Sequence, residues 1–559
     1  MVYSIESKIQ VRGQLRVVKA LHVGGFGTST NIDLPLAVNG QGQVYIPGTS
    51  LAGALRGWTR QVMGEELANA LWGYQPDPAT APLMGTDKQN KDGHASRVLI
   101  EDARVSLASG EAMTPTHMEI RSGVGIDRFR GAAAEKCLYT RGVIPKGATL
   151  AFELSVEIVD QGKQETVKNA VEQLLLAMQS EEIRLGAAKS RGLGRVRLEN
   201  CKQLRRETTA DVVGIVPMGM SDRTGMLALL KARQNLDAHF CDWKAPAVTH
   251  QRPRLIITLD WQPVGPLMVK STLTGKAIDI LPLMAAHESG ESFLLPGSSI
   301  KGAVRSQAER IIRTVTDRHL TEASDFLTQI RLPLINELFG IAADEKASTA
   351  PNSNSEKSWQ QGLGALYMED CFSQTQHPRN TLQQLSQVDQ DQPQSLKSAL
   401  TSTNMTGEQC DTQLAYHVAV DRWTGGAAEN FLYTNLEPFN VPWEPMEWAI
   451  DFDRMPISES DSLAGAALLL LLLRDLSNRK IPLGYGTNRG LGTLRIKQVS
   501  FEIRGEVPSP LEALAGTTWQ AEGEAALSFT GLDSEMLGPL NSVWQTWIQQ
   551  NMQEVGSDE

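Results

Sequence analysis

Cysteine is scarce in this 559-residue chain, and it does not stand where it would do chemistry. The cysteines share no CxxC pair and no His/Cys spacing typical of a zinc site, and they are too scattered for a disulfide framework. They are Cys137, Cys201, Cys241, Cys371 and Cys410. A structural zinc site and a disulfide-rich secreted domain are therefore excluded, and a reducing cytoplasm is the expected location.

Long hydrophobic runs are also missing. The longest, Leu463 to Leu473, is well short of the roughly 20 apolar residues that span a bilayer. The first residues, MVYSIESKIQVRG, lack a basic segment followed by an apolar one, so no secretory signal is expected. The run predicts a buried helix, and no membrane partner is expected.

Basic residues are absent from Gly505 to Glu559, where nine acids contribute −9 of the net charge of −11. The rest of the chain is close to neutral, and its positive charge is concentrated. Arg184 to Arg206 carries eight basic residues against one acid, and Arg121 to Lys146 carries six against two. Such tracts indicate a groove for a polyanion, the alternative being ordinary solvated faces.

The chain contains the same series of phrases twice, in the same order. KSRGLGRVRL, from Lys189, returns as TNRGLGTLRI, from Thr487, and YIPGTSLAGALRG returns as LLPGSSIKGAVRS. LIEDARVS is matched by LYMEDCFS, and VGIDRFRGAAAEKCLYT by VAVDRWTGGAAENFLYT. Ordered matches of this kind indicate two tandem copies of one fold.

Each copy predicts an α+β unit. An alternating strand (Lys8 to Val17; Arg254 to Gln262) leads to a helix that begins at PG(T/S)S, with serine as the expected cap. A second apolar helix (Val167 to Met178; Ala464 to Leu476) precedes the glycine phrase and a last strand. We therefore expect two tandem ferredoxin-like (RRM-like) domains with loop insertions.

The expected domain boundaries follow from the repeat. The first domain covers 1–207, a connection with a short helix (Gly225 to Leu236) covers 208–250, and the second domain covers 251–504. Polar insertions are expected at about 342–361 and 374–411. An acidic C-terminal extension, with Trp544 and Trp547 in a helix, covers 505–559.

The glycine phrase suggests phosphate binding but not a dinucleotide fold, because the glycines here follow a helix and precede a strand. Arg191 and Arg489 could hold a phosphate, and the glycines could let backbone N–H groups approach it. The alternative is a turn whose glycines serve geometry alone. The predicted contacts here are Lys189, Arg191, Gly192, Gly194, Arg489, Gly490 and Gly492.

The helix that begins at PG(T/S)S offers further cations. Lys301 and Arg305 lie at i and i+4, and Arg56 takes the place of Arg305 in the first copy. With the helix start these are predicted phosphate contacts. Arg128 and Arg422 each follow an aspartate. The first expectation for them is an internal ion pair that fixes a loop, and the second is a contact with RNA.

Two loop aspartates are the candidate catalytic acids. Asp33 follows the first strand in a glycine-rich loop, and Asp279 stands in the matching loop of the second copy, each before an apolar residue and near a proline. An acid in a loop is usually a cap or turn residue. Beside an anion groove, however, one carboxylate with Mg²⁺ or Mn²⁺ could orient a phosphodiester.

Taken together, these phrases resemble the RAMP superfamily of CRISPR-associated proteins, specifically the guide-RNA-binding backbone subunits of type III effector complexes. Two units in one chain look like the fused tandem subunits of type III-D-like systems. The resemblance implies binding of CRISPR RNA and target RNA, assembly with other subunits, and metal-dependent cleavage of target RNA at the loop aspartate. Asp33 matches this aspartate directly, whereas Asp279 matches less well because its loop has one more residue before the proline.

Two alternatives remain. The chain could be an RNA scaffold in which both aspartate loops are silent. It could instead be a guide-processing endoribonuclease that uses His22, a further candidate RNA contact, as a general base.

Overall fold

The computed structural model describes most of the chain. The described ranges are 7–25, 32–75, 93–159, 163–206, 241–242, 252–287, 290–320, 326–341, 362–388, 411–455, 459–521 and 534–552. The connecting helix predicted at Gly225 to Leu236, the insertion at 342–361 and the later part of the insertion at 374–411 lie outside these ranges.

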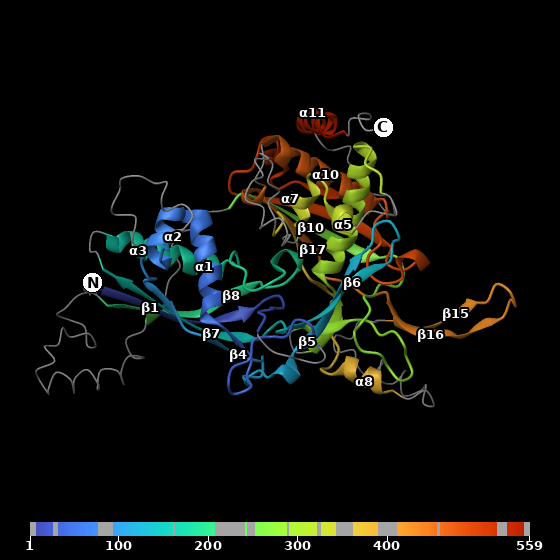
Figure 1. Ribbon diagram of the computed structural model, residues 1–559, viewed down its shortest axis with the longest axis horizontal. Helices are drawn as coiled ribbons and strands as arrows, with labels where there is room; N and C mark the ends of the chain where they lie inside the picture. The colour runs from blue at the N-terminus through green and yellow to red at the C-terminus, as the bar shows by residue number, and fades with distance from the viewer. Residues whose placement is uncertain are drawn as a thin grey trace, which may run out of the picture.

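The first unit contains an antiparallel sheet covered by helices on one face (Figure 1). Its elements are β1 (Ser7–Val17), β2 (Tyr45–Ile46), α1 (Gly48–Met63), α2 (Glu65–Trp72), β3 (Val98–Ile100), β4 (Ala103–Ser106), β5 (Glu119–Ile126), β6 (Ala133–Val143), β7 (Thr149–Ile158), α3 (Gln164–Gln179), the 3₁₀ turn η4 (Lys189–Arg191), β8 (Val196–Arg206) and β9 (Cys241–Asp242).

The second unit repeats this arrangement. Its elements are β10 (Arg254–Pro263), β11 (Met284–His287), β12 (Gly290–Leu295), α5 (Gly297–Val315), α6 (Phe326–Ile330), α7 (Ile335–Phe339), β13 (Leu366–Met368), β14 (Cys371–Phe372), α8 (Thr381–Gln387), β15 (Asp411–Val420), β16 (Ala427–Phe439), β17 (Met446–Asp451), η7 (Phe452–Arg454), α10 (Glu459–Ser477), η8 (Thr487–Arg489), β18 (Leu494–Arg504), η9 (Leu511–Leu514), β19 (Thr518–Gln520) and α11 (Ser534–Asn551).

Four strands of each sheet share one topology. In the first unit β8, β1, β7 and β3 pair in that order, and all pairs are antiparallel. In the second, β18, β10, β17 and β13 pair likewise. With one helix after the first strand and one before the last, this is the ferredoxin-like arrangement, and the predicted tandem α+β fold is confirmed.

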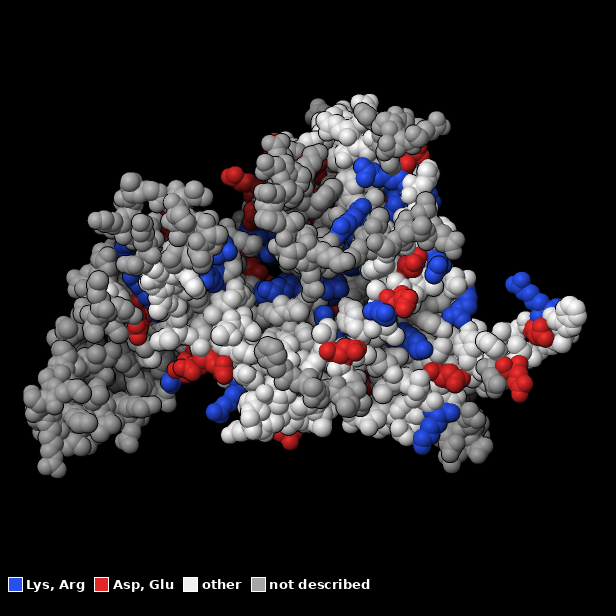
Figure 2. All heavy atoms as spheres, in the orientation of Figure 1, with Lys and Arg blue, Asp and Glu red and all other residues white. Residues whose placement is uncertain are grey.

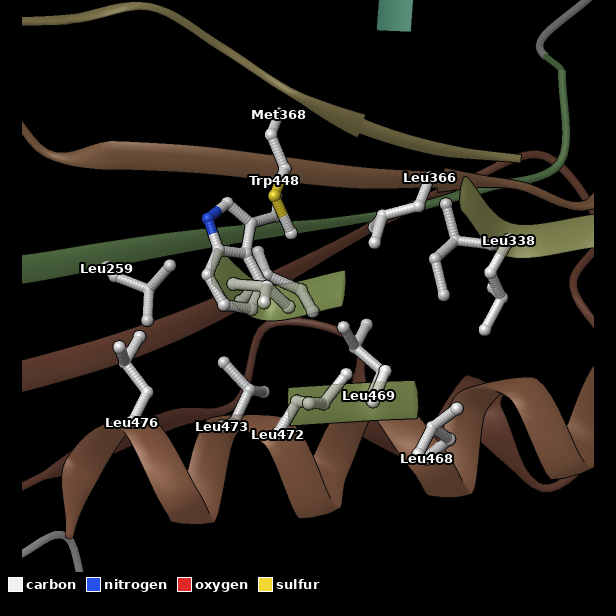
Figure 3. Packing of buried hydrophobic residues seen from close by; sticks show 14 of the residues in the cluster. Leu259, Leu338, Leu366, Met368, Trp448, Leu468, Leu469, Leu472, Leu473 and Leu476 are labelled. Carbon is white, nitrogen blue, oxygen red and sulfur yellow. The ribbon is translucent and has the colours of Figure 1, made fainter. Parts of the chain in front are cut away.

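The leucine run forms helix α10 and lies in the core of the second unit. Leu468, Leu472 and Leu476 are fully buried, and they pack with their neighbours toward Trp448 of β17 (Figure 3). Burying a leucine side chain contributes about 1.5–3 kcal/mol. The predicted buried helix is confirmed, and no helix in the described ranges has the length and apolarity needed to cross a bilayer.

The segment after residue 504 is part of the second unit rather than a separate extension. Strand β19 pairs with β18 and widens the sheet. Helix α11 packs on α10, where Trp544 and Trp547 stack 5.6 Å apart and the Trp547 indole N–H donates to Asp461 at 3.2 Å. The acidic composition of this segment gave no sign of the packing, because α11 contacts the core through apolar side chains such as Leu540, Trp544 and Trp547.

Candidate nucleic-acid interface

Asp33 is held at the root of the β5–β6 hairpin by one residue, Thr140. Its Oδ2 accepts hydrogen bonds from the Thr140 backbone N–H at 2.6 Å and from the Thr140 hydroxyl at 2.8 Å. The Leu34 N–H donates to the Thr140 carbonyl at 3.0 Å, so the loop lies along β6 like a short parallel strand. The carboxylate is exposed, and its direction is fixed by these bonds.

Asp279 has the same anchor in the second unit. Its Oδ2 accepts from the Thr434 N–H at 2.8 Å and from the Thr434 hydroxyl at 3.1 Å. The Ile280 N–H donates to the Thr434 carbonyl at 3.0 Å, which repeats the parallel bridge. The loop's additional residue does not displace the aspartate, so Asp33 and Asp279 occupy equivalent positions.

Each aspartate keeps one oxygen available. None of the described residues donates a hydrogen bond to Oδ1 of Asp33 or of Asp279. The hydrogen bonds from the backbone and side chain of Thr140 lower the pKa of Asp33 below its ordinary value. Asp33 is therefore an anion in the neutral range, and among the described residues its Oδ1 receives no hydrogen bond.

An arginine lies on the other side of each hairpin root. Neighbouring residues of a strand point to opposite faces, so Tyr139 faces away from Asp33, and its hydroxyl accepts a hydrogen bond from Arg191 at 3.4 Å. In the second unit Arg489 bonds the hydroxyl of Tyr433, and its guanidinium lies 4.9 Å from the centre of the Tyr485 ring. Both arginines are exposed.

The glycines beside these arginines serve the turn itself. Gly192 and Gly490 end η4 and η8 in the left-handed region, with φ near 89° and 88°. A Cβ on Gly194 or Gly492 would lie about 2 Å from the carbonyl oxygen of Leu185 or Leu483, and both N–H groups donate to carbonyls within their own unit. Turn geometry explains Gly194 and Gly492, whose N–H groups are used within the protein, whereas contact of Gly192 and Gly490 with RNA stays a prediction.

Several residues of the basic tracts face the second unit rather than a groove. Arg121 binds Asp370 at 2.5 Å in the interior, Arg184 binds Glu369, and Arg195 binds Glu447 at 3.0 Å. We call this contact between units the junction. Basic residues of the first unit meet acids of the second there, so the charge concentration had a structural cause that composition could not distinguish from a polyanion groove.

Lys301, Arg305 and Arg128 also belong to the protein interior. The Lys301 ammonium is 4% exposed and donates to Ser190 and to the Leu366 carbonyl, so it joins the two units. Arg305 and Arg128 both bind Glu309. Their prediction as RNA contacts is corrected, since their donors are used by protein acceptors.

His22 is a structural residue. Its ring is 4% exposed, Nδ1 lies 2.7 Å from the Gly142 carbonyl oxygen, and burial lowers its pKa. Its assignment as an RNA contact or as a general base is corrected, because a buried ring tied to β6 cannot reach a scissile phosphate.

The remaining cations lie in three settings. Arg56 is half-buried and donates to Asn69 at 3.3 Å. Arg422 is exposed at the tip of the β15–β16 hairpin, where Asp421 caps the turn instead of pairing with it. Lys189 is half-buried in a cleft at the junction.

The two PG(T/S)S helices do not begin as predicted. Neither has a side-chain cap from serine or threonine. Instead the first N–H group, of Gly48 or Gly297, donates to a distant carboxylate, Asp102 at 2.7 Å or Asp370 at 2.9 Å. The protein's own acids thus occupy the predicted anion positions.

Sequence reasoning missed the residues that build the hairpin root. The LYT phrase is part of the repeat, but the sequence alone assigns no role to its tyrosine and threonine. Their recurrence at fixed spacing was the available signal, and the tertiary contacts explain it: tyrosine meets the arginine, and threonine holds the aspartate.

Comparisons with known proteins identify the family and several relatives of the chain. The RAMP superfamily profile matches residues 14–197 and 265–364. The "CRISPR system Cms endoribonuclease Csm3" of Methanocaldococcus jannaschii is 22% identical over 206 residues, or 36% of this chain and 82% of that protein. Its namesakes from Streptococcus thermophilus and Enterococcus italicus are 26% and 27% identical over 35% and 34% of this chain and 89% of each relative.

Each relative thus accounts for about a third of the chain, the length of one unit. The family profile, in contrast, covers half of the chain and reaches into both units. On this match and on the repeated ferredoxin-like architecture, the chain belongs to the RAMP superfamily.

Proposed function

We propose that the chain is a CRISPR RNA-binding backbone subunit of a type III effector complex, and that it contributes metal-dependent cleavage of target RNA paired to the guide. The observation that carries this proposal is the repeated hairpin root. In each unit a threonine of the hairpin fixes a loop carboxylate, and the preceding tyrosine contacts an exposed arginine. Two equivalent sites in one chain predict two cuts at fixed spacing.

The relatives support the reaction class. The three relatives, each matched over about a third of this chain, bear the name endoribonuclease. An exposed anionic carboxylate, with an exposed arginine on the other side of the same hairpin root, suits phosphodiester chemistry better than acyl or hydride transfer, because the substrate carries its charge at the reacting centre.

A divalent ion at this site would have few ligands from the protein. Within the described residues no three acidic, histidine or cysteine side chains gather to hold a metal. Mg²⁺ and Mn²⁺ commonly use one or two carboxylates together with substrate phosphates and water, and Oδ1 of Asp33 or Asp279 offers that ligand. When bound, the ion would supply charge stabilisation at the phosphate.

The protein's own residues hold the carboxylate ready. Thr140 and Thr434 use two donors each to fix Oδ2, which leaves Oδ1 as the oxygen that can meet RNA. Arg191 and Arg489 can neutralise backbone phosphates on the opposite side of the hairpin root. Binding through the backbone leaves sequence choice to pairing between guide and target.

Assembly with further subunits is supported by the hairpin of the second unit. The β5–β6 hairpin lies against the second unit, whereas β15–β16 projects away from the body (Figure 1). Its exposed side chains include Tyr416, Leu432 and Trp423, the last 94% exposed. Exposed apolar side chains at this density mark an interaction site, and a neighbouring subunit is the proposed occupant.

The test is a cleavage assay on the assembled complex with guide RNA and labelled complementary RNA. Asp33→Ala should remove one product and Asp279→Ala another, and EDTA should remove both. The matched control is Asp317→Ala, which removes an exposed acid after α5. Full cutting by the double variant would contradict the proposal.

Two other outcomes would favour the alternatives. If the assembled complex binds guide and target but never cuts, the chain is a scaffold. If precursor RNA is cut without metal, guide processing is favoured, although buried His22 does not support it.

A further inference from the structure

A basic cleft lies at the junction, apart from the two hairpin roots. It has a volume of about 110 Å³. One wall is a face of α1 with Gly53 and Gly57, and the other carries Tyr367 of β13. Figure 2 shows lysine and arginine side chains gathered in the hollow between the units.

Five basic residues line this cleft, and both units contribute. The first unit provides Arg184 and Lys189 from the approach to the glycine turn. The second provides Arg252, Arg254 and Arg454. The residue of the second unit that corresponds to Lys189 is Thr487. The glycine turn of the second unit therefore offers no lysine for a cleft of this kind.

Glu182 also lines the cleft and Arg184 pairs with Glu369, but the other arginines of the cleft have to share their acids. Three guanidinium groups share the buried carboxylate of Asp451, with Arg252 at 2.8 Å, Arg254 at 3.6 Å and Arg454 at 3.9 Å. Asp453 approaches only Arg252, at 3.3 Å. Among these cations a further negative group would be stabilised.

Lys189 is the cation of the cleft whose charge a bound anion would stabilise most. No described residue pairs with its ammonium group. Burial, followed by the charges of Arg454 and Arg184, lowers its pKa, which indicates a positive local potential. A bound anion would relieve this repulsion.

The shape of α1 also suits a ligand. A Cβ on Gly53 or on Gly57 would meet no heavy atom within 4 Å, so protein packing does not require glycine at either position. Glycine inside a helix costs about 1 kcal/mol relative to alanine. Two glycines at i and i+4 keep this face of the helix flat and open toward the cations, at a size that admits a phosphate group.

We propose that this cleft binds a backbone phosphate of the guide RNA where the RNA passes from the first unit to the second. The proposal rests on the function proposed above, and it names a contact that depends on the covalent pairing of the two copies. Free phosphate and nucleotides carry the same chemical group, so the test must separate them from RNA.

The test measures the affinity of the full-length protein for fluorescein-labelled single-stranded guide RNA over a series of salt concentrations. Lys189→Ala should weaken binding on the order of tenfold and lower the slope of log K against log salt by about 0.7. Gly57→Leu fills the cleft without changing charge and should weaken binding similarly. The control Lys168→Ala removes a lysine of α3 that pairs with Glu165 at 3.8 Å, and it should leave both quantities unchanged.

Several results would overturn the proposal. If Lys189→Ala and Gly57→Leu both bind RNA like the wild type while Asp33-dependent cutting persists, the cleft proposal fails and the proposed function stands. If the wild type binds no guide at all, both fail. If ATP or inorganic phosphate binds the wild type but not Lys189→Ala while the RNA slope is unchanged, the cleft serves a small phosphate ligand and the assignment to RNA is wrong.

Discussion

The glycine turn of the first unit is buried against its neighbour, whereas the same turn of the second unit faces solvent. In the first, the Ser190 hydroxyl accepts a hydrogen bond from Lys301, and a Cβ on Gly192 would lie 2.4 Å from Asp370. In the second, a Cβ on Gly490 would meet nothing within 4 Å. Nearly identical residues therefore form an interface once and an open surface once.

The hairpins show the same contrast. β5–β6 is tied to the second unit, where Arg128 binds Glu309 and Gln329. β15–β16 has an arginine at the equivalent position, Arg422, and it is exposed. The motif specifies a hairpin with an arginine near its tip, and only the presence of a neighbour decides what that arginine binds.

The ion pairs of the junction are not part of the repeat. Strand register and the matching glycine turns align Arg121, Arg184 and Arg195 with Ala415, Pro482 and Thr493. The outer face of the second unit therefore cannot repeat these bonds with another copy of the chain. The comparison teaches that the repeated residues specify fold and site, while the unrepeated ones specify which surfaces meet.

The largest expected effect is on the free energy of unfolding, and it distinguishes Asp370 from Asp102, its counterpart in the first unit. Asp370 and Asp102 each accept the first N–H of a helix, but only Asp370 also pairs with buried Arg121. Asp370→Asn leaves that guanidinium without its closest counter-charge and should lower the free energy of unfolding by about 3–5 kcal/mol. Asp102→Asn should cost about 1 kcal/mol. Urea denaturation measures both, and equal losses would show that the junction pair adds nothing.

The next effect concerns acid stability at the junction. Burial acts to raise the pKa of Glu444. The hydrogen bond from His287 and the charges of Lys19 and Lys146 outweigh burial and lower this pKa to about 2. This stabilisation is present above the ordinary carboxyl pKa near 4.5 and is lost as the pH falls toward 2. Because Glu444 is partly exposed, Glu444→Gln should lower the free energy of unfolding by about 1–3 kcal/mol at pH 7.

Its control lies on strand β18, away from the junction contacts of Glu444. Glu502 is exposed and pairs only with nearby Arg504 at 2.7 Å, so Glu502→Gln should leave the pH dependence of stability unchanged. Parallel curves for Glu444→Gln and the wild type between pH 5 and pH 2 would refute the role of Glu444.

A smaller effect tests whether the two hairpin roots are equivalent. Thr140→Val keeps the backbone donor to Asp33 but removes the hydroxyl, so the cut assigned to Asp33 should slow by about tenfold, the value of one charge-assisted hydrogen bond. Because that bond lowers the pKa of Asp33, the acid limb of the rate profile should move to higher pH. Thr434→Val should affect only the other cut. Loss of both cuts in either variant would indicate a structural effect.

The smallest effect distinguishes exposed from buried cations. Arg191→Ala and Arg489→Ala should each reduce the salt slope of guide binding by about 0.7 per lost phosphate contact, whatever the RNA sequence. Lys301→Met should leave the slope unchanged, because Lys301 binds Ser190 and Leu366. A lower slope for Lys301→Met alone would restore the sequence-based interpretation.

Much of the fold was predictable, because hydrophobic periodicity and ordered repeats record it directly. The strands predicted at Lys8 to Val17 and Arg254 to Gln262 differ from β1 and β10 by one residue at one end. Helix α10 was visible as a leucine run. The site was predictable only in part: its aspartates and exposed arginines recur in sequence, but a charge pattern does not tell whether Arg121 faces RNA or Asp370, which lies 249 residues away in the chain.

The sequence by itself determined that two ferredoxin-like units follow one another and that each carries an aspartate loop, a hairpin and an arginine-glycine turn, because these features depend on local patterns and on their repetition. Only the tertiary structure decided which cations pair with Asp370, Glu369 and Glu309. It also decided that a distant carboxylate accepts the first N–H group of a helix, and where the cleft between the units lies. Long-range electrostatic pairing depends on which surfaces meet, and no local pattern records that.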